Sequence, residues 1–382
     1  MKRRIRLGMV GGGQGGFIGA AHRVAARLDD EYQLVAGALS SDPQRARDSG
    51  AELRLDVERC YADYREMAAQ EARRPDGIDV VTIVTPNYLH FPVAKAFLEQ
   101  GIHVICDKPL TTTLADADEL QRLTAQTGLL FMVTHIYSGY PLVRHARELV
   151  EAGALGDIRV VQVEYAQDWL AEPLEQAGQK QAEWRADPNR AGPAGALGDI
   201  GTHAFHLASF VTGLEVSELA AELTSFVAGR QLDDHVQVML RFKGGARGML
   251  WASQVACGNA NRLQLRVFGS KAAIHFDQEN PDELWFTPLG QPAQRIRRGA
   301  TPAGAAAAQA TRLPAGHPEG YFEAFGQLYR DFASQWHVCS EGGSVASASS
   351  RIPTVADGRQ GMAFIDAVLR SHQGGTQWVG MR

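Results

Sequence analysis

The sequence is poor in cysteine, has no long apolar run and carries no excess of positive charge. Its four cysteines, Cys60, Cys106, Cys257 and Cys339, form no C-x-x-C pair, which argues against a disulfide framework and favours reduced thiols. The net charge of −5 leaves no basic face for nucleic acid. No segment reaches the roughly 18 apolar residues of a membrane span. We therefore expect a soluble cytoplasmic protein that binds neither nucleic acid nor a membrane.

With 382 residues, of which 45% are hydrophobic, the chain can bury a sizeable core and form two domains. Its first part alternates short, continuously apolar segments with helical patterns. The apolar segments are Ile5–Val10, Gln33–Leu39, Val80–Val84, His103–Cys106 and Leu129–Thr134. Such alternation is typical of a parallel sheet covered by helices on both faces. We predict an α/β Rossmann dinucleotide-binding domain over residues 1–140.

A different pattern follows the helix expected at about Pro141–Ala152. Longer segments of alternating polarity are Ile158–Ala166, Glu218–Phe226, Asp234–Phe242, Arg247–Gln254 and Arg262–Gly269. Alternation predicts an antiparallel sheet with one face on the core, and hence an α+β domain over residues 141–382. Amphipathic helices are predicted over Tyr321–Trp336 and Val355–Arg370, and the C-terminal helix could pack back on the first domain. Pro292–Gly316, rich in Ala, Gly, Pro and Arg, predicts an exposed loop.

A glycine-rich turn closes the first predicted strand. It satisfies G-x-G-x-x-G between a strand and a helix, the context in which this pattern binds a dinucleotide pyrophosphate at the helix N-terminus. The expected contacts are Gly11, Gly12, Gly13, Gln14, Gly15, Gly16, Phe17 and Ile18. The register has an alternative, because Gly19 could serve as the third glycine and would place an insertion inside the turn.

The second predicted strand ends in Ser40 and Ser41, where an acidic residue usually holds the adenosine ribose. The absence of that carboxylate, together with nearby Arg45, favours the 2′-phosphate of NADP. Asp42 could still hold the ribose of NAD. The sequence therefore predicts NAD or NADP and leaves the choice open.

Two further motifs follow predicted strands. Thr85-Pro86-Asn87, with His90 one helical turn later, comes after Val80–Val84. Asp107-Lys108-Pro109 follows the next strand in the same way. Ligands of open parallel sheets bind beyond the carboxyl ends of the strands. We therefore expect Thr85, Pro86, Asn87, His90, Asp107, Lys108 and Pro109 at the cofactor, with Lys108 also catalytic.

Asp199 and His203 are four residues apart, which places them on one face of a helical turn. A carboxylate in this position can orient an imidazole and stabilise its protonated form, as in other acid–base pairs. His203 and His206 could suggest a metal, but no nearby cysteine or acidic cluster completes a site. We predict a catalytic acid–base pair and no metal.

Taken in this order, the motifs resemble those of the Gfo/Idh/MocA oxidoreductase family. Trp184-Arg185 and Gly198-Asp199-Ile200-Gly201-Thr202-His203 complete the resemblance, which covers almost the whole chain. It implies a Rossmann domain and a second domain with a large, open, mostly antiparallel sheet that often forms an oligomer interface. It also implies NAD(H) or NADP(H) and a sugar or cyclitol substrate. By this resemblance, Lys108 binds the reacting hydroxyl or carbonyl, His203 is the general acid/base and Asp199 is its partner.

The chain also departs from the family pattern. Asp107 stands where a glutamate is usual, His206 replaces an acidic residue of many relatives, and His135–Tyr140 is an unusual aromatic string. An extra stretch from Trp169 to Glu183 is expected to wall the substrate pocket. The expected substrate contacts are Lys108, His135, Tyr137, Trp184, Arg185, Asp199 and His203.

We therefore predict an NAD(P)-dependent dehydrogenase that reversibly oxidises a secondary hydroxyl of a sugar, glycoside or cyclitol. One alternative is a reductase of a ketosugar or another carbonyl compound. Another is a non-catalytic regulator that senses the nucleotide. Because one face of the second sheet needs a cover, we also expect a homodimer or homotetramer.

Overall fold

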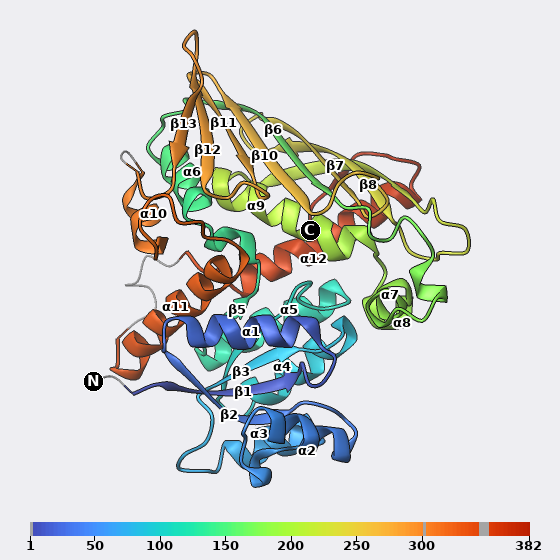
Figure 1. Cartoon of the computed structure of the whole chain (residues 1–382). Coiled ribbons are helices and arrows are strands. Elements are labelled where there is room, and N and C mark those ends of the chain that lie inside the picture. Colours follow the sequence, from blue (N-terminus) through green and yellow to red (C-terminus); the bar gives the residue numbers. More distant parts are fainter. Residues whose placement is uncertain (1–2, 301–302, 344–350) are drawn as a thin grey trace. The chain divides into compact units, whose positions relative to one another are not determined.

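The computed structural model describes residues 3–300, 303–343 and 351–382 (Figure 1). In these ranges the chain forms two compact units. The first unit contains Met1–Ile136 and Tyr321–Arg359, and the second contains Tyr137–Gly320 and Gln360–Arg382. The segment from Tyr321, which our domain boundaries placed in the second domain, thus belongs to the first unit. No helix in the described ranges has the length and hydrophobicity that crossing a bilayer requires.

In the described part of the first unit, parallel strands form a sheet of order β2-β1-β3-β4-β5. The strands are β1 (Ile5–Gly11), β2 (Tyr32–Ala38), β3 (Val80–Val84), β4 (His103–Cys106) and β5 (Phe131–Val133). The intervening helices are α1 (Phe17–Leu28), α2 (Pro43–Glu52), α3 (Tyr64–Glu71), α4 (His90–Leu98) and α5 (Leu114–Thr127). Every residue of β3 is buried, as expected for a strand covered on both faces. The predicted Rossmann architecture is confirmed.

A helix from the end of the chain completes this unit. Helix α11 (Tyr321–Ser340) packs against α1 and buries Phe325, Tyr329 and Phe332 almost completely. The next helix, α12 (Val355–Gln373), begins in the first unit and continues into the second. Residues that follow β13 (Gln294–Arg297) of the second sheet therefore supply part of the core of the Rossmann unit.

The described residues of the second unit form a larger sheet of order β13-β12-β11-β10-β6-β9-β8-β7-β14. β6 and β9 pair in parallel, whereas neighbours elsewhere in the sheet are antiparallel. The strands are β6 (Ile158–Ala166), β7 (Val216–Thr224), β8 (His235–Phe242), β9 (Arg247–Ser253), β10 (Arg262–Gly269), β11 (Ala272–Asp277), β12 (Glu283–Pro288), β13 (Gln294–Arg297) and β14 (Val379–Gly380). This confirms the prediction of a large, mostly antiparallel sheet.

The helices of this unit are α6 (Pro141–Glu151), α7 (Lys180–Ala186), α8 (Pro188–Ala191), α9 (Thr202–Thr212) and α10 (Ala305–Ala310). The loop predicted over Pro292–Gly316 is wrong in part, because β13 and α10 lie within it. Alanine has the highest helix propensity, and the run at α10 buries Ala306, Ala307 and Ala310. Residues 301–302 of this segment lie outside the described residues.

The larger sheet has two different faces. One face carries buried residues such as Val163 and Leu250 and contacts helices α6 and α9 (Figure 1). On the opposite face, the strand register places Met239 directly beside Met249, with Trp285 further along the same cross-strand row. Met239, Met249 and Trp285 are 51%, 50% and 40% exposed. This outer face therefore presents large apolar side chains to its surroundings.

Candidate active site

The glycine-rich turn adopts a conformation that side chains would prevent. Gly11, Gly12 and Gly15 have positive φ angles of 82°, 69° and 75°. A Cβ on Gly12 would lie 2.8 Å from the Cα of Gly19, and one on Gly19 would lie 2.5 Å from the Cα of Gly12. Gly19 thus provides the close contact between turn and helix, which is the role of the third glycine in a dinucleotide-binding fingerprint.

The start of α1 suits an anionic ligand. Gly16 is the N-cap of this helix, and within the described residues no side chain accepts a hydrogen bond from its first N–H groups. A Cβ on Gly13 would lie 2.6 Å from the carbonyl oxygen of Leu39 and 2.8 Å from the hydroxyl of Ser49, so the turn leaves no room for a side chain there. Backbone N–H groups at a helix N-terminus form a ready site for phosphate. The residues present therefore fit a dinucleotide.

Beyond β2, the carboxylate nearest the expected ribose position has another partner. Asp42 caps helix α2, since its Oδ1 accepts a 2.8 Å hydrogen bond from the backbone N–H of Arg45. The hydroxyl of Ser40 accepts from the N–H of Asp42 at 3.2 Å. The side chains of Ser41 and Arg45 are exposed. This end of the sheet thus presents the hydroxyls of Ser40 and Ser41 and the guanidinium of Arg45, while the carboxylate of Asp42 caps helix α2.

His90 connects the loops that follow β3 and β4. Its Nδ1 lies 2.8 Å from the carbonyl oxygen of Pro109, and its Nε2 lies 2.9 Å from that of Thr85. The ring is fully buried, and burial lowers the pKa of His90. Because both nitrogens face backbone carbonyls, His90 holds the two loops together. Asn87 is also buried, whereas Thr85 and Pro86 are partly exposed.

Asp107, at the end of β4, is fixed through its backbone and its side chain. Its N–H donates to the carbonyl of Ile83 at 3.1 Å, and its Oδ1 accepts from Thr134 at 2.6 Å and lies 2.9 Å from His22 Nε2. Burial alone would raise the pKa of Asp107, but His22 and Thr134 hold it at about 2. The partly exposed Lys108 follows directly, and its peptide bond to Pro109 is cis.

In the second unit, Asp199 lies in a π-helical turn over Leu197–Gly201 that leads directly into α9. The carboxylate of Asp233 anchors the start of this turn by accepting hydrogen bonds from the N–H groups of Gly195 at 2.6 Å and Leu197 at 2.7 Å. Burial raises the pKa of Asp233 to about 6. His203 follows on α9 and is 7% exposed.

The carboxylate of Asp199 accepts hydrogen bonds from outside its own helical turn. Its Oδ2 accepts from Gln254 Nε2 at 2.9 Å and from Arg185 Nε at 3.2 Å. The Arg185 guanidinium also lies 4.2 Å from the ring centroid of Trp184, within range of a cation–π interaction. The carboxylate is therefore fixed from a strand end and from helix α7, both outside its own helical turn.

Tyr137 packs its ring against that of His203, with the ring centroids 4.9 Å apart and the planes at 77°. The hydroxyls of Tyr137 and Tyr165 are hydrogen-bonded. Because Tyr165 donates its proton to Asn261 Oδ1 at 2.8 Å, Tyr137 is the donor to Tyr165. Burial raises the pKa of Tyr137. Tyr137 thus directs its hydroxyl into the protein and offers its ring to His203.

The same hydrogen-bond network continues to Asp199. Asn261 Oδ1 also accepts from Gln167 Nε2 at 2.6 Å, and Gln167 Oε1 accepts from Trp169 Nε1 at 3.0 Å. Gln254 Nε2 lies 3.4 Å from Gln167 Oε1 and donates to Asp199 as well. Neutral amide side chains thus link the tyrosine beside His203 to the carboxylate one helical turn before it.

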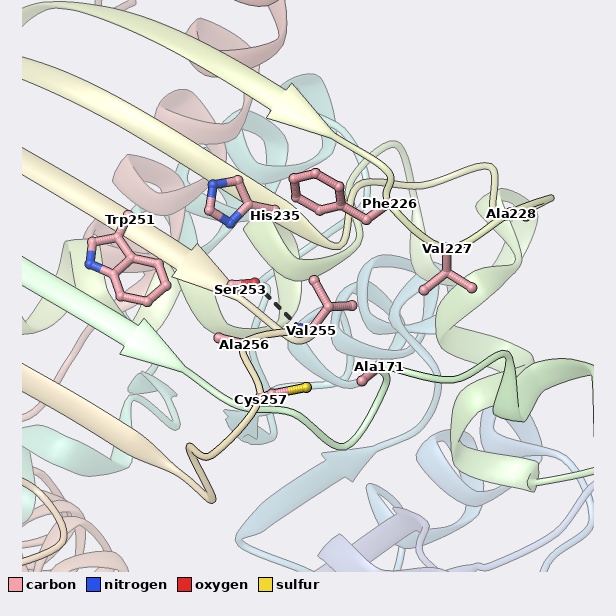
Figure 2. A pocket seen from close by; sticks show the side chains of 10 residues that line it. All are labelled: Ala171, Phe226, Val227, Ala228, His235, Trp251, Ser253, Val255, Ala256 and Cys257. Atoms are coloured by element: carbon pink, nitrogen blue, oxygen red, sulfur yellow. Dashed lines mark hydrogen bonds between the residues drawn. The ribbon is translucent and has the colours of Figure 1, made fainter.

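A separate hollow lies on the outer face of the larger sheet. This pocket of about 610 Å³ is bordered by Phe226, His235 and Trp251 (Figure 2). Ser253 and Val255 also line it, while the side chain of Gln254 between them contacts Asp199. Side chains alternate between the faces of an extended chain. The pocket is therefore on the opposite side of this segment from Asp199.

Comparison with known proteins agrees with this geometry. Residues 5–135 match the model of an oxidoreductase family with an NAD-binding Rossmann fold, and residues 143–275 match the GFO/IDH/MocA C-terminal domain. An uncharacterized oxidoreductase of Bacillus subtilis, YfiI, is 35% identical over 99% of this chain and 97% of its own length. The chain belongs to the GFO/IDH/MocA oxidoreductase family.

Two other similar proteins are named by their activity or their ligands. A levoglucosan dehydrogenase of Pseudarthrobacter phenanthrenivorans is 30% identical over 97% of this chain and 96% of its own. The crystal structure of an inositol dehydrogenase homolog of Azotobacter vinelandii, complexed with NADH and myo-inositol, is 38% identical. That structure has a TM-score of 0.93 and covers 100% of this chain and 98% of its own. The predicted family and nicotinamide cofactor are confirmed, and the protein is an NAD(P)-dependent dehydrogenase.

The predicted site residues of this GFO/IDH/MocA oxidoreductase fall in both units. Residues in the first unit are the expected cofactor contacts together with Lys108 and His135. Residues in the second unit are Tyr137, Trp184, Arg185, Asp199 and His203. The second unit brings Arg185 to Asp199 and Tyr137 to His203. His135 is 2% exposed and His90 is fully buried.

The residues that hold these groups carry no signal in the sequence. Gln254 and Asn261 follow and precede strands, and neither belongs to a motif that a sequence search would select. His22 and Tyr329 likewise belong to no motif that indicates a functional role. Their partners lie far away in the sequence, so no local spacing indicates them.

Proposed function

We propose that this protein reversibly oxidises a secondary hydroxyl of a sugar, glycoside or cyclitol. The observation that carries the proposal is the environment of the Asp199–His203 turn, where Gln254 and Arg185 hold the carboxylate and Tyr137 packs against the imidazole. A levoglucosan dehydrogenase and an inositol dehydrogenase homolog with bound myo-inositol, both similar over almost the whole chain, support this class of substrate.

In this proposal His203 is the general base for oxidation. Its imidazole takes the proton of the substrate hydroxyl and returns it in the reductive direction. Asp199, one helical turn earlier and fixed by two donors, stabilises the protonated ring. The positive charge of Lys108 stabilises the negative charge that develops on the substrate oxygen, an effect worth roughly 10²–10³-fold in rate. The bound dinucleotide supplies hydride acceptance at its nicotinamide ring.

The glycine turn and the start of α1 hold the pyrophosphate in this account, with Thr85, Pro86 and Asn87 beside the same cofactor. Because Asp42 caps α2 and Arg45 is exposed, the adenosine end can receive the 2′-phosphate of NADP. The exposed Asp42 can equally receive the ribose of NAD, so we propose NAD or NADP as the cofactor. Arg45→Ala should raise the KM for NADP while leaving the KM for NAD nearly unchanged. Equal changes in the two KM values would show that Arg45 does not discriminate between NADP and NAD.

The substrate contacts in this proposal combine aromatic rings with donors. Trp184 and Arg185 form a stacked pair beside Asp199, which suits the apolar face and the hydroxyls of a polyhydroxylated ring. Tyr137 contributes its ring, since its hydroxyl is bonded to Tyr165. His135 and the Trp169–Glu183 stretch are further candidates, and Trp169 lies 5.8 Å from the Arg185 guanidinium.

A second copy of the chain is the proposed cover for the outer face of the larger sheet. Met239 and Met249, neighbours in the strand register, are each about half exposed there. Light scattering should therefore show a homodimer or homotetramer. The double variant Met239→Lys/Met249→Lys should shift the oligomeric equilibrium to the monomer. Leu289→Lys, at a 79% exposed turn, should have no effect. A monomer in the unaltered protein would refute this assembly.

Mutation of the acid–base and electrostatic groups tests the proposed reaction. Lys108→Met and His203→Ala should each lower kcat by at least about 10²-fold while NADH still binds. Unchanged turnover in both variants would overturn the mechanism. Turnover that occurs only from a ketone and NAD(P)H would favour a reductase. Binding of NADH without turnover of any polyol or ketone would favour a nucleotide-sensing regulator.

A further inference from the structure

A buried histidine on α1 occupies the space between three segments of the Rossmann unit. His22 is fully buried. Its Nε2 lies 2.9 Å from Asp107 Oδ1, and its Nδ1 lies 2.7 Å from the hydroxyl of Tyr329 on α11. Its ring packs edge-on against Phe325, with centroids 4.5 Å apart. The imidazole therefore links the helix after the glycine turn, the end of β4 and helix α11.

The far side of this link is also fixed. The hydroxyl of Tyr329 lies 3.0 Å from Thr82 Oγ1 in the middle of β3, and the backbone carbonyl of Tyr329 accepts from the hydroxyl of Tyr32 at 2.7 Å. Tyr329 is 1% exposed. Side chains buried this completely and bonded at both ends have little freedom to move. Tyr329 is thus a rigid support for the His22 ring.

Lys108 lies between two such supports. On one side, the carboxylate of Asp107 bonds with His22 and Thr134. On the other side, the carbonyl of Pro109 contacts the buried His90. Asp107 is partly buried, and a carboxylate in such a place that loses a donor must find another partner or move, because leaving it unsatisfied is costly. Removal of His22 would therefore release the chain on the N-terminal side of Lys108.

We propose that His22, supported by Tyr329, is a positioning residue that sets the direction of Lys108 relative to helix α1. The proposal rests on the proposed function for the role of Lys108 in turnover. His22 itself contacts Asp107, so it acts through the loop and not on the substrate. Since α1 also begins at the glycine turn, one helix would align both the pyrophosphate and the lysine.

The test compares His22→Leu, His22→Gln and Tyr329→Phe. His22→Leu removes both polar contacts, His22→Gln keeps one N–H donor for Asp107, and Tyr329→Phe removes only a hydroxyl. The matched control is His145→Leu, because His145 is 4% exposed in the second unit, where its Nδ1 accepts from the N–H of Gly304 at 3.0 Å. The unaltered protein is measured in parallel.

Two readouts are used. Hydrogen exchange of a peptide that covers Cys106–Leu110 should accelerate at least about fivefold in His22→Leu, less in Tyr329→Phe, and remain unchanged in His145→Leu. In steady-state kinetics, His22→Leu should lower kcat by about tenfold or more, and His22→Gln should recover part of that loss. The KM for the dinucleotide should change by less than about threefold, because the glycine turn is intact.

Either unchanged exchange of this peptide or an unchanged kcat in His22→Leu would overturn the proposal. If His22→Leu does not fold, faster exchange in Tyr329→Phe supports the proposal and unchanged exchange overturns it. If the unaltered protein turns over no polyol or ketone while exchange accelerates as expected, the proposed function fails and the anchoring of the loop stands. If the unaltered protein turns over a polyol while exchange in His22→Leu stays unchanged, the proposed function stands and the anchoring role of His22 fails.

Discussion

Gln254 donates a 2.9 Å hydrogen bond to Asp199, a residue 55 positions earlier in the chain. The donor follows strand β9, and the acceptor lies in the turn before helix α9. The larger sheet therefore determines the orientation of the carboxylate next to His203. The neighbouring Gln167 and Asn261 extend this support to the tyrosine pair beside the imidazole.

Replacement of Gln254 tests the role of this support. Gln254→Leu should lower kcat/KM by about 10-fold to 100-fold, because a hydrogen bond to a charged group contributes about 1.5–3 kcal/mol. The control is Gln264→Leu, since Gln264 is also buried and donates to Asp277 at 3.0 Å on the same sheet. Similar losses in the two variants would show a general effect on the sheet and contradict the account.

Two substitutions of Tyr137 separate its hydroxyl from its ring. Tyr137→Phe should change kcat by less than about threefold and lower stability by about 1 kcal/mol, because only the bond to Tyr165 is lost. Tyr137→Ala also removes the ring that packs on His203, and should lower kcat by at least about tenfold. If Tyr137→Phe alone abolishes turnover, the hydroxyl takes part in the reaction and our assignment is wrong.

The contact between Gly12 and Gly19 predicts a strict requirement for glycine. In Gly19→Ala the new Cβ would lie 2.5 Å from Gly12 Cα, so the turn must shift and NADH affinity should fall by at least about tenfold. Gly361→Ala is the control, because no described atom outside its own stretch of helix lies within 4 Å of a Cβ built there. Fluorescence titration with NADH measures both, and equal affinities would contradict the assigned register.

The motifs that we propose to carry the chemistry can be selected from the sequence, whereas the groups that hold them cannot. Lys108 and the Asp199–His203 pair stand out because strand ends and helical spacing are local properties. The side-chain partners of Asp199 come from α7 and the residue after β9, and those of Asp107 come from α1 and the residue after β5. Such contacts depend on how distant segments pack, which no local pattern encodes.

The loop predicted at Pro292–Gly316 shows a second reason why the structure differs from what the sequence predicts. Glycine and proline in this stretch indicate a loop, and both residue types also flank short ordered elements. Gly304 caps the alanine run that forms α10, and Glu148 of α6 accepts a 2.7 Å hydrogen bond from the N–H of Ala306. Tertiary contacts therefore stabilise a helix in a segment whose composition alone is that of a loop.

His103 predicts a dependence of stability on pH. Its Nδ1 accepts a 2.9 Å hydrogen bond from the N–H of Leu130, and burial lowers its pKa from 6.5 to about 4. Between these values the unfolded chain binds a proton that the folded chain does not, so stability falls as the pH falls from 6.5 to 4. The loss attributable to this residue is up to about 3 kcal/mol.

Urea unfolding at several pH values measures this contribution. His103→Asn keeps an acceptor near the Nδ1 position and does not titrate in this range. The stability difference between the unaltered protein and His103→Asn should therefore shrink, or change sign, as the pH is lowered from 7 to 4. A difference that is constant with pH would show that His103 is not responsible.

The most direct test of the central claim is absorbance at ~340 nm, the signature of reduced nicotinamide. The protein is mixed separately with NAD⁺ and NADP⁺ across inositols, free hexoses and glycosides, together with the Lys108→Met and His203→Ala variants. We predict an increase in absorbance with at least one polyol, lost in both variants. No increase in absorbance with any compound of the panel, despite measurable NADH binding, would contradict the proposed dehydrogenase activity.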